Sequence, residues 1–415
     1  MKLVKMSLAA AMLMGASAYA LDDVKFNGEA KLWYQTNDAI DAVTGLPSSD
    51  ADLFGQSSSI GGASFVLGMT GKASETVSFN LEATAFDTLG LENNLVSNVA
   101  ATGSADTQWW VSQANLAIKL GNTTAVLGRQ TLDTPLAFTE KWNVVKNTFD
   151  AAVVVNGDIP NTTLVAAYVG KENSALGGQT VATDGAFASY GSSLNGNGLF
   201  TNPTDTAQGA YAVGAVFAGI PNNTLQGWYY NVNELATAYW LQVDGKVDLG
   251  NEMGLTYGVQ FANVSPDLAG VDANTAYALK VGYSVSGVNM FAAYSDVSDD
   301  NAAVGMNNVS TQNQTKLYTG AGLNGMLLAQ GSHINVAAPD TTAWTVGVDT
   351  TVSGVTLMAE YTADTTGTAP EVDQSMWAVA AVTNVAGIDL LAGVTAGDTG
   401  AIDVTAVRIT AGLKF

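Results

Sequence analysis

The chain has 415 residues, 15 Lys and Arg against 37 Asp and Glu, a formal net charge of −22, and no cysteine. The lack of cysteine excludes a disulfide scaffold, a thiolate metal site and a cysteine nucleophile. The acidic balance argues against nucleic acid as a partner, because binding backbone phosphates needs Lys and Arg. An acidic chain instead concentrates cations near any opening that it surrounds. The alternative is that acidic loops keep the protein soluble or attract divalent ions at a cell surface.

The N-terminus has the pattern of a secretory signal peptide. Lys2 and Lys5 precede an apolar run over 6–16, and Ala18-Tyr19-Ala20 supplies a small-x-small cleavage site. The run is too short for an uncleaved membrane anchor. We therefore expect residues 1–20 to be removed, which takes away two of the 15 bases and leaves 13 against 37 acids, a net charge of −24.

From residue 21 onward the sequence alternates apolar and polar residues, as strands do. A clear example is the segment 252–261, where Met253, Leu255, Tyr257, Val259 and Phe261 alternate with polar residues and glycines. No later stretch is long and apolar enough for a transmembrane helix. Since only helices and closed barrels satisfy their backbone in hydrocarbon, a membrane protein with this pattern is expected to be a β-barrel.

The last fifteen residues, 401–415, point to the outer membrane. From Val407 onward one face of this strand is apolar and ends on Phe415, while Arg408 and Lys414 lie on the other face. Lipid-facing apolar residues at every second position, with aromatics near the strand ends, are typical of outer-membrane barrels. A soluble β-sandwich with ordinary core aromatics is the alternative. A closing strand that ends on Phe415 also predicts an interaction with the barrel-assembly machinery.

The connections alternate between short turns and long loops, and all eight prolines fall in them. Residues 21–415 are thus expected to form one transmembrane antiparallel β-barrel of about 18 strands. An extra hairpin within 316–329 would make 20 strands, and merging a doubtful strand at 233–237 would make 16. A barrel of 16 to 18 strands encloses an aqueous channel.

One segment carries a resemblance to a known family. It contains Gly-Arg-Gln at 128–130, Thr-Pro-Leu at 134–136, Asn-Thr-Phe at 147–149 and Asp-Ile-Pro-Asn-Thr-Thr-Leu at 158–164. With the two chain ends, it resembles the campylobacterial (epsilonproteobacterial) major outer membrane porins and the related OprD-type porins. The resemblance implies an 18-stranded channel whose third long loop, here 132–147, folds inward as a constriction.

The resemblance also implies properties that this chain only partly shares. OprD-like members line the pore with a ladder of arginines that guides carboxylates, whereas this chain has only Arg129 and Arg408. We therefore expect cation preference or broad permeability. Campylobacterial members are trimeric and OprD-like members can be monomers, so a homotrimer is one expectation.

Charged side chains in a narrow, partly desolvated passage can sort solutes by sign. The residues expected at the constriction are Arg129, Asp133, Glu140, Lys141 and Lys146. Those expected on the facing wall are Glu252, Lys280, Glu360, Arg408 and Lys414. The alternative for each is an ordinary solvated charge.

Other site chemistry is sparse. Asp296, Asp299 and Asp300 could ligate calcium through oxygen atoms, but the run lacks the glycine and distal glutamate of an EF-hand loop. A solvated acidic loop is the alternative. His333 is the only histidine, so a Ser-His catalytic arrangement has a single candidate base. The sequence predicts neither an enzyme nor a bound cofactor.

The expected function is passive diffusion of small hydrophilic solutes and ions, with cations preferred, through a porin of a Gram-negative outer membrane. A substrate-specific channel and a surface structural protein or adhesin are the alternatives. The expected partners are the lipid bilayer and lipopolysaccharide, and no nucleic acid.

Overall fold

The computed structural model describes residues 22–41, 46–99, 108–173, 209–301, 304–310, 314–323, 327, 334–367 and 371–415. The predicted signal peptide and His333 lie outside the described residues. No helix in the described part of the chain is long and apolar enough to cross a membrane.

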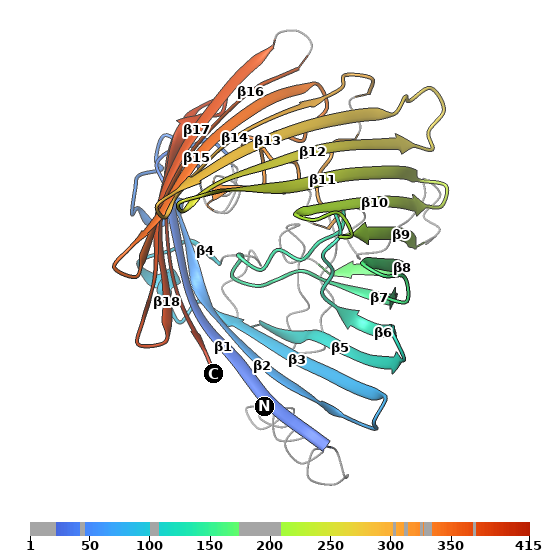
Figure 1. Cartoon of the computed structure of the whole chain (residues 1–415). Helices are drawn as coiled ribbons and strands as arrows, with labels where there is room; N and C mark the ends of the chain where they lie inside the picture. Colours follow the sequence, from blue (N-terminus) through green and yellow to red (C-terminus); the bar gives the residue numbers. More distant parts are fainter. Residues whose placement is uncertain are drawn as a thin grey trace.

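Eighteen strands form a closed antiparallel barrel in which each strand pairs with its neighbour in the chain, and β19 pairs with β1 (Figure 1). The barrel strands are β1 (Asp22–Asn37), β2 (Ser59–Lys72), β3 (Val77–Asp87), β5 (Gln108–Leu120), β6 (Thr123–Gln130), β7 (Thr148–Asn156), β8 (Thr162–Asn173), β9 (Ala210–Phe217), β10 (Asn223–Val232), β11 (Ala236–Gly250), β12 (Met253–Pro266), β13 (Asn274–Val285), β14 (Val288–Val297), β15 (Thr341–Val352), β16 (Val355–Thr366), β17 (Val372–Val385), β18 (Ile388–Asp398) and β19 (Asp403–Lys414). The two-residue β4 (Asn98–Val99) pairs in parallel with Ile60 and Gly61 near the start of β2 and is not a barrel strand. The 18-stranded prediction is therefore confirmed.

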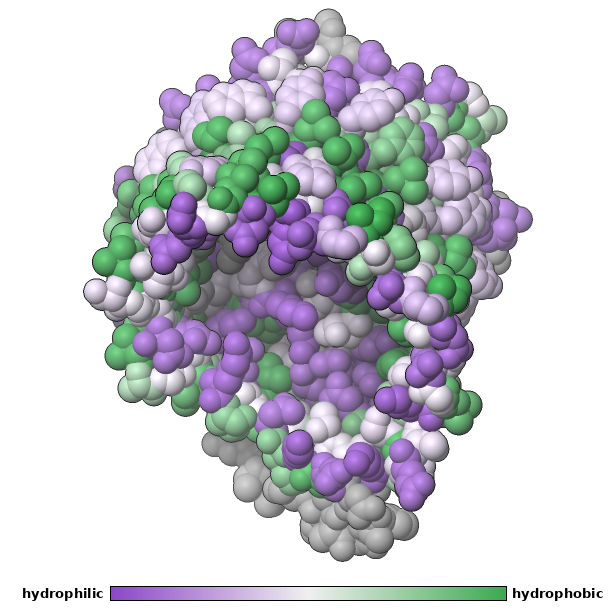
Figure 2. Space-filling view, viewed as in Figure 1, coloured by the Kyte–Doolittle hydropathy of each residue, from purple (hydrophilic) through white to green (hydrophobic). Residues whose placement is uncertain are grey.

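The outer face of the sheet is apolar and its inner face is polar, the reverse of the pattern in a soluble protein. On β19, Ile409 and Leu413 are 48% and 41% exposed on the outer surface, whereas Arg408, on the opposite face of the strand, is buried inside. Figure 2 shows a hollow lined by hydrophilic residues, with hydrophobic residues on the outer surface. The predicted assignment of the two faces of the closing strand is thus confirmed.

Short turns join the strands at one end of the barrel. Three of them place two consecutive residues at positive φ: Ser286–Gly287, Ser353–Gly354 and Ala386–Gly387. This is the backbone of the tight hairpin turn whose twist matches that of paired strands, and glycine occupies the second position at no steric cost. At the same end the chain closes, because the backbone N–H groups of Phe415 and Gly28 each donate to the other residue's carbonyl, at 3.0 and 2.8 Å.

Longer connections lie at the opposite end, called here the loop end. The 38–58 and 88–107 connections contain the short 3-10 helices η1 (Gln56–Ser58) and η2 (Leu91–Asn93). Two alternatives for the strand count are corrected. Residues 233–235 form a three-residue connection between β10 and β11, and the described residues of 316–329 contain no strand.

Candidate functional site: a lumen narrowed by two inward loops

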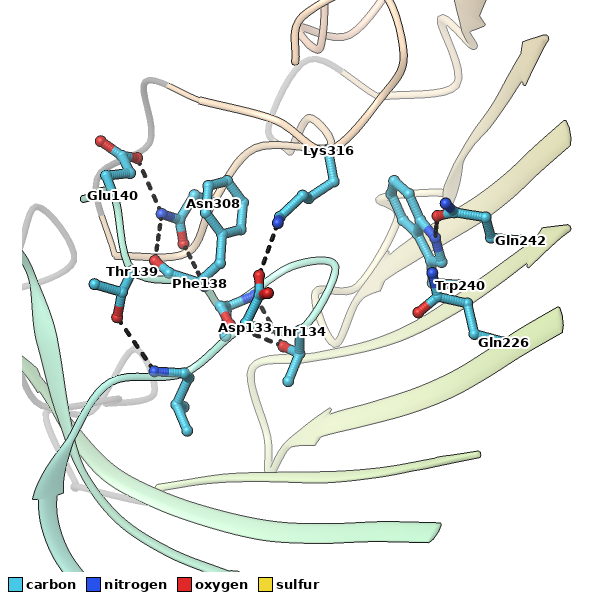
Figure 3. Close-up of polar contacts among 12 residues, drawn as sticks. Asp133, Thr134, Phe138, Thr139, Glu140, Gln226, Trp240, Gln242, Asn308 and Lys316 are labelled. Carbon is cyan, nitrogen blue, oxygen red and sulfur yellow. Dashed lines mark hydrogen bonds and ion pairs between the residues drawn. The ribbon is translucent and has the colours of Figure 1, made fainter. Parts of the chain in front are cut away.

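The connection between β6 and β7, residues 131–147, turns into the barrel and is called here the first inward loop (Figure 1). Its tip is a small hairpin, in which Thr134 N–H donates to the Ala137 carbonyl at 3.0 Å and Thr139 N–H donates to the Leu132 carbonyl at 2.8 Å. The Thr139 hydroxyl also accepts a hydrogen bond from Leu132 N–H at 3.2 Å (Figure 3). These local bonds give the tip a defined shape without a strand pairing to the wall.

The base of the first inward loop is bonded to the wall formed by β1, β2 and β3. Lys31 Nζ donates to the Asn143 carbonyl at 3.0 Å, and the Ser64 hydroxyl donates to the Val144 carbonyl at 2.9 Å. Lys146 Nζ lies 2.7 Å from Glu82 Oε2. The loop is therefore fixed to inward side chains of three successive strands.

The tip reaches a different part of the wall. Leu136 belongs to a buried apolar cluster that also contains Trp228 on β10 and Trp240 on β11. Their indole N–H groups donate to Gln226 and Gln242, respectively, at 2.9 and 3.0 Å. Bound at β1–β3 and at β10–β11, the first inward loop narrows the channel.

A second connection, 298–340 between β14 and β15, also folds inward and is called here the second inward loop. The sequence does not predict this inward fold. Its described residues pack on a wall of small inward side chains, with Met306, Leu317 and Tyr318 against the alanines at 262, 276, 278 and 293. Leu323 and Leu327 pack in the same way against the alanines at 378 and 380.

Two wall glycines make room for this loop. A Cβ on Gly258 would overlap the ring and hydroxyl of Tyr318, and a Cβ on Gly393 would overlap Leu327. The Tyr318 hydroxyl donates to Asp244 Oδ1 at 2.7 Å. Burial, reinforced by this hydrogen bond to a carboxylate, raises the pKa of the Tyr318 hydroxyl, so it stays a neutral donor.

The two inward loops are bonded to each other. Asn308 of the second loop accepts from Phe138 N–H at 3.2 Å and donates to the Phe138 carbonyl at 2.9 Å and to Glu140 Oε1 at 3.0 Å. Val309 N–H donates to the Leu136 carbonyl at 2.9 Å. Since Asn308 is fully buried, these bonds form a protected junction between the loops.

An ion pair at the same junction is exposed to the lumen of the barrel. Lys316 Nζ lies 2.7 Å from Asp133 Oδ1, and the two side chains are 38% and 79% exposed. The Lys316 ammonium also lies 4.8 Å from the centre of the Phe138 ring. In Figure 3 the Lys316 and Asp133 side chains point toward each other, and the wall residues Gln226, Trp240 and Gln242 lie to one side of them. This opposed pair of charges is the clearest ionic feature of the constriction.

The predicted constriction residues divide into three groups. Asp133 and Lys141 are exposed on the first inward loop, while Lys146 is bound to Glu82. Glu140 is buried instead of facing the wall, and it accepts hydrogen bonds from Asn143 and Asn308. Arg129 does not lie in the constriction.

The correction for Arg129 follows from the alternation on β6. Leu127 is exposed on the outer surface and Gln130 is buried on the inside, so Arg129 faces outward. There its guanidinium forms an ion pair with Asp150 on β7, at 2.7 Å, and donates to the Val111 carbonyl at 2.8 Å. The charge is satisfied on the outer face of the barrel.

Four of the five predicted wall residues face inward on strands. Lys280 lies 4.6 Å from the centre of the Phe291 ring, and Glu360 accepts from the Leu323 N–H of the second inward loop at 2.8 Å. Arg408 donates to Gln35 Oε1 at 2.7 and 3.0 Å, and Lys414 lies 3.5 Å from Asp389 near the turn end. The fifth is corrected, because Glu252 lies in the β11–β12 turn with a positive φ of 60°.

The structure does not assemble the predicted calcium ligands. Asp296 accepts a hydrogen bond from Thr342 at 2.8 Å, whereas Asp299 and Asp300 are exposed in the loop that follows β14. In the described part of the chain, no three His, Cys, Asp or Glu side chains are grouped so that they could hold a metal ion.

The model of the OprD family of outer membrane porins matches residues 21–374. The chain belongs to the OprD family. No curated protein matches it. This OprD-family porin is similar in structure to Pseudomonas aeruginosa OccK9 (OpdG), with a TM-score of 0.73 and 16% identity over 95% of this chain and 98% of the other.

Two further solved structures from Pseudomonas aeruginosa are similar to this chain over nearly its whole length. OccK8 (OprE) has a TM-score of 0.70 and 16% identity, over 95% of this chain and 98% of that one. OccK2 (OpdF), solved in complex with glucuronate, has a TM-score of 0.71 and 13% identity, over 96% of this chain and 99% of that one. The family and the closed barrel make this OprD-family chain a porin of the bacterial outer membrane.

Proposed function

We propose that this porin provides a water-filled path for passive diffusion of small hydrophilic solutes and ions, with cations preferred. The observation that carries the proposal is the charge of the loop end. The nine connections there contain 17 Asp and Glu but only three bases, Lys141, Lys146 and Lys316, all in the two inward loops. Such a mouth raises the local concentration of cations before they reach the constriction.

The bases near the lumen do not offset this preference, because most of them already have a partner. Lys146 is bound to Glu82 and Lys316 to Asp133. Of the two arginines, Arg129 faces outward, and Arg408 is buried against Gln35 and 4.8 Å from the Trp33 ring. The chain therefore lacks the row of arginines with which an OprD-like channel would guide carboxylates such as the glucuronate bound by OccK2.

Liposome swelling tests the passive part of this proposal. Purified mature protein in liposomes should admit neutral sugars at rates that fall with solute size and do not saturate with concentration. It should admit a small organic cation faster than an anion of equal size. Uptake of one solute that saturates and blocks the others would instead establish a substrate-specific channel. Absence of any uptake would favour a surface structural protein.

The strings at 128–130, 134–136, 147–149 and 158–164 support a finer placement within the family, close to the campylobacterial porins. We also infer that the chain has no enzymatic activity, since its family consists of channels and its expected role needs no bond chemistry.

A further inference from the structure

Three charged side chains lie together on the outer face of the barrel, at the loop end of β6, β7 and β8. Arg129 pairs in register with Asp150, and Asp150 pairs in register with Lys171. We call these three residues the outer cluster. Leu127, two positions before Arg129 on the same face, is 43% exposed, so the outer cluster directly adjoins the lipid-facing surface. Charges on this face need an explanation, because hydrocarbon does not solvate them.

A β-bulge places Lys171 on the outer face. Along β8, Ala167 and Val169 face inward and pack in a buried apolar cluster, so strict alternation would turn Lys171 inward as well. The register between β7 and β8 shifts at this point, and Gly170 is the extra residue. The shift brings Lys171 opposite Asp150. Bulges are common beside functional sites, where they redirect a side chain.

Arg129 is held in place by its neighbours and keeps donors available. Its Nε and Nη2 donate to the Asp150 carboxylate at 2.7 and 3.1 Å, and its Nη1 donates to the Val111 carbonyl at 2.8 Å. Asn173 donates to the same carboxylate at 3.2 Å. Among the described residues, Arg129 thus uses three of the five N–H groups of a guanidinium. With Lys171, the outer cluster has two positive charges and one negative charge, a net charge of +1.

The outer cluster lies at the membrane interface. Tyr168 is the outward residue that precedes Lys171 on β8, and its ring centre lies 5.2 Å from that of Tyr211 on β9. The two residues are 42% and 51% exposed on the outer surface. Outward aromatic residues mark the boundary between hydrocarbon and headgroups. Since Lys171 is the next outward position toward the loop end, the outer cluster lies at the level of the headgroups.

The outer cluster differs in charge from the rest of this rim. In the described barrel strands, the other charged residues that face outward at the loop end are all aspartates. They are Asp87 on β3, Asp296 on β14, Asp373 on β17, Asp398 on β18 and Asp403 on β19. The last two pair with each other in register. An anionic headgroup is therefore repelled by β14–β19 and attracted to β6–β8.

We propose that the outer cluster binds a phosphate group of lipid A, the lipid anchor of lipopolysaccharide. Guanidinium and ammonium groups are strong donors to phosphate, and Asp150 fixes the guanidinium of Arg129 beside Lys171. The acyl chains of the same lipid fit the exposed apolar surface of Leu127 and Tyr168 below. The contact is direct, whereas at the aspartates of the rim a phosphate needs a divalent cation as a bridge.

Binding of lipid A to the refolded mature protein in detergent tests the site. In EDTA, diphosphoryl lipid A should bind the wild type roughly fivefold more tightly than Lys171→Met, the effect of one base at a membrane surface. Lys171→Arg should keep most of the affinity. Lys246→Met, which removes an exposed lysine at the turn end of β11, should bind like the wild type. Equal affinities of Lys171→Met and the wild type would overturn the proposal.

Further arms of this experiment identify the ligand. Dephosphorylated lipid A should bind the wild type as weakly as diphosphoryl lipid A binds Lys171→Met, and inorganic phosphate alone should not compete. Competition by phosphatidylglycerol as strong as by lipid A would show a site for any anionic lipid. Loss of binding in EDTA would show that cations on the rim aspartates hold the lipid. Either result contradicts the proposal. An unchanged single-channel conductance of Lys171→Met excludes a folding defect, because Lys171 faces away from the lumen.

Discussion

Lys316 and Asp133 join the two inward loops through an ion pair of 2.7 Å, across 183 positions of the sequence. The pair is partly exposed, so its contribution to the stability of the fold is small, about 0–1 kcal/mol for an exposed pair. Its position in the narrowed lumen gives it a larger effect on permeating ions, since fixed charges are less screened in a confined passage.

Neutralising the two members of this pair should move ion selectivity in opposite directions. Asp133→Asn leaves the Lys316 ammonium without its carboxylate, so the cation-to-anion permeability ratio should fall roughly a few-fold. Lys316→Met leaves Asp133 alone, so the ratio should rise. Reversal potentials in a salt gradient measure both changes. If both variants shift the potential in the same direction, the pair does not line the ion path.

Separating the loops should loosen the constriction. Asn308→Ala removes three hydrogen bonds to Phe138 and Glu140, including the side-chain acceptor of the buried Phe138 N–H, and an unsatisfied buried polar group costs about 1–3 kcal/mol. Single-channel recordings should show a larger or noisier open current than in the wild type. Asn307→Ala is the matched control, because among the described residues that side chain donates a hydrogen bond to Asn335, within the second inward loop. If the two variants gave the same open current and noise, the bonds between the two inward loops would not be what holds the constriction.

The contact between Gly258 and Tyr318 should hold the second inward loop on the wall. Gly258→Ala places a methyl group where the tyrosine ring lies, so the loop should move into the lumen and lower the conductance. In a Tyr318→Ala background the same change has no ring to displace, so Gly258→Ala should then have little further effect. An equal loss of conductance in both backgrounds would mean that the glycine acts through the strand and not through the loop.

Neighbouring positions on the closing strand should respond oppositely to a charge. Ile409→Lys places an ammonium on the lipid face, which costs about 2–4 kcal/mol near the bilayer midplane. Thr410→Lys places the same group on the inner face, where water solvates it. Urea titrations of refolding into lipid vesicles compare the two. Equal stability of the two variants would contradict the assignment of faces.

The sequence predicted the barrel well because alternation is a local signal. In the closing strand, the alternation from Val407 to Phe415 shows which side chains face the lipid and which face the lumen. The first inward loop was predicted from its charges and from its short sequence matches to the porin family. The second inward loop was missed because its packing is non-local: Tyr318 lies on Gly258, 60 positions away. A signal was present, since Ala276, Ala278 and Ala293 stand at inward positions where a wet lumen would favour polar residues.

Charges were harder to assign than strands. Arg129 was expected in the constriction because it adjoins the first inward loop, but one position of the alternation decides whether a side chain faces in or out. Glu140 was expected to face the lumen, yet its partner Asn308 is 168 positions away in a loop with no strand pattern. Spacing along the chain does not carry such information.

The reversal potential of the purified mature wild-type protein in a planar bilayer under a potassium chloride gradient tests the central claim most directly. The acidic loop end and the partnered lumen bases predict ohmic single-channel steps and a potential of the sign that cation flow produces. A potential of the opposite sign, or a membrane with no conductance, would contradict the account.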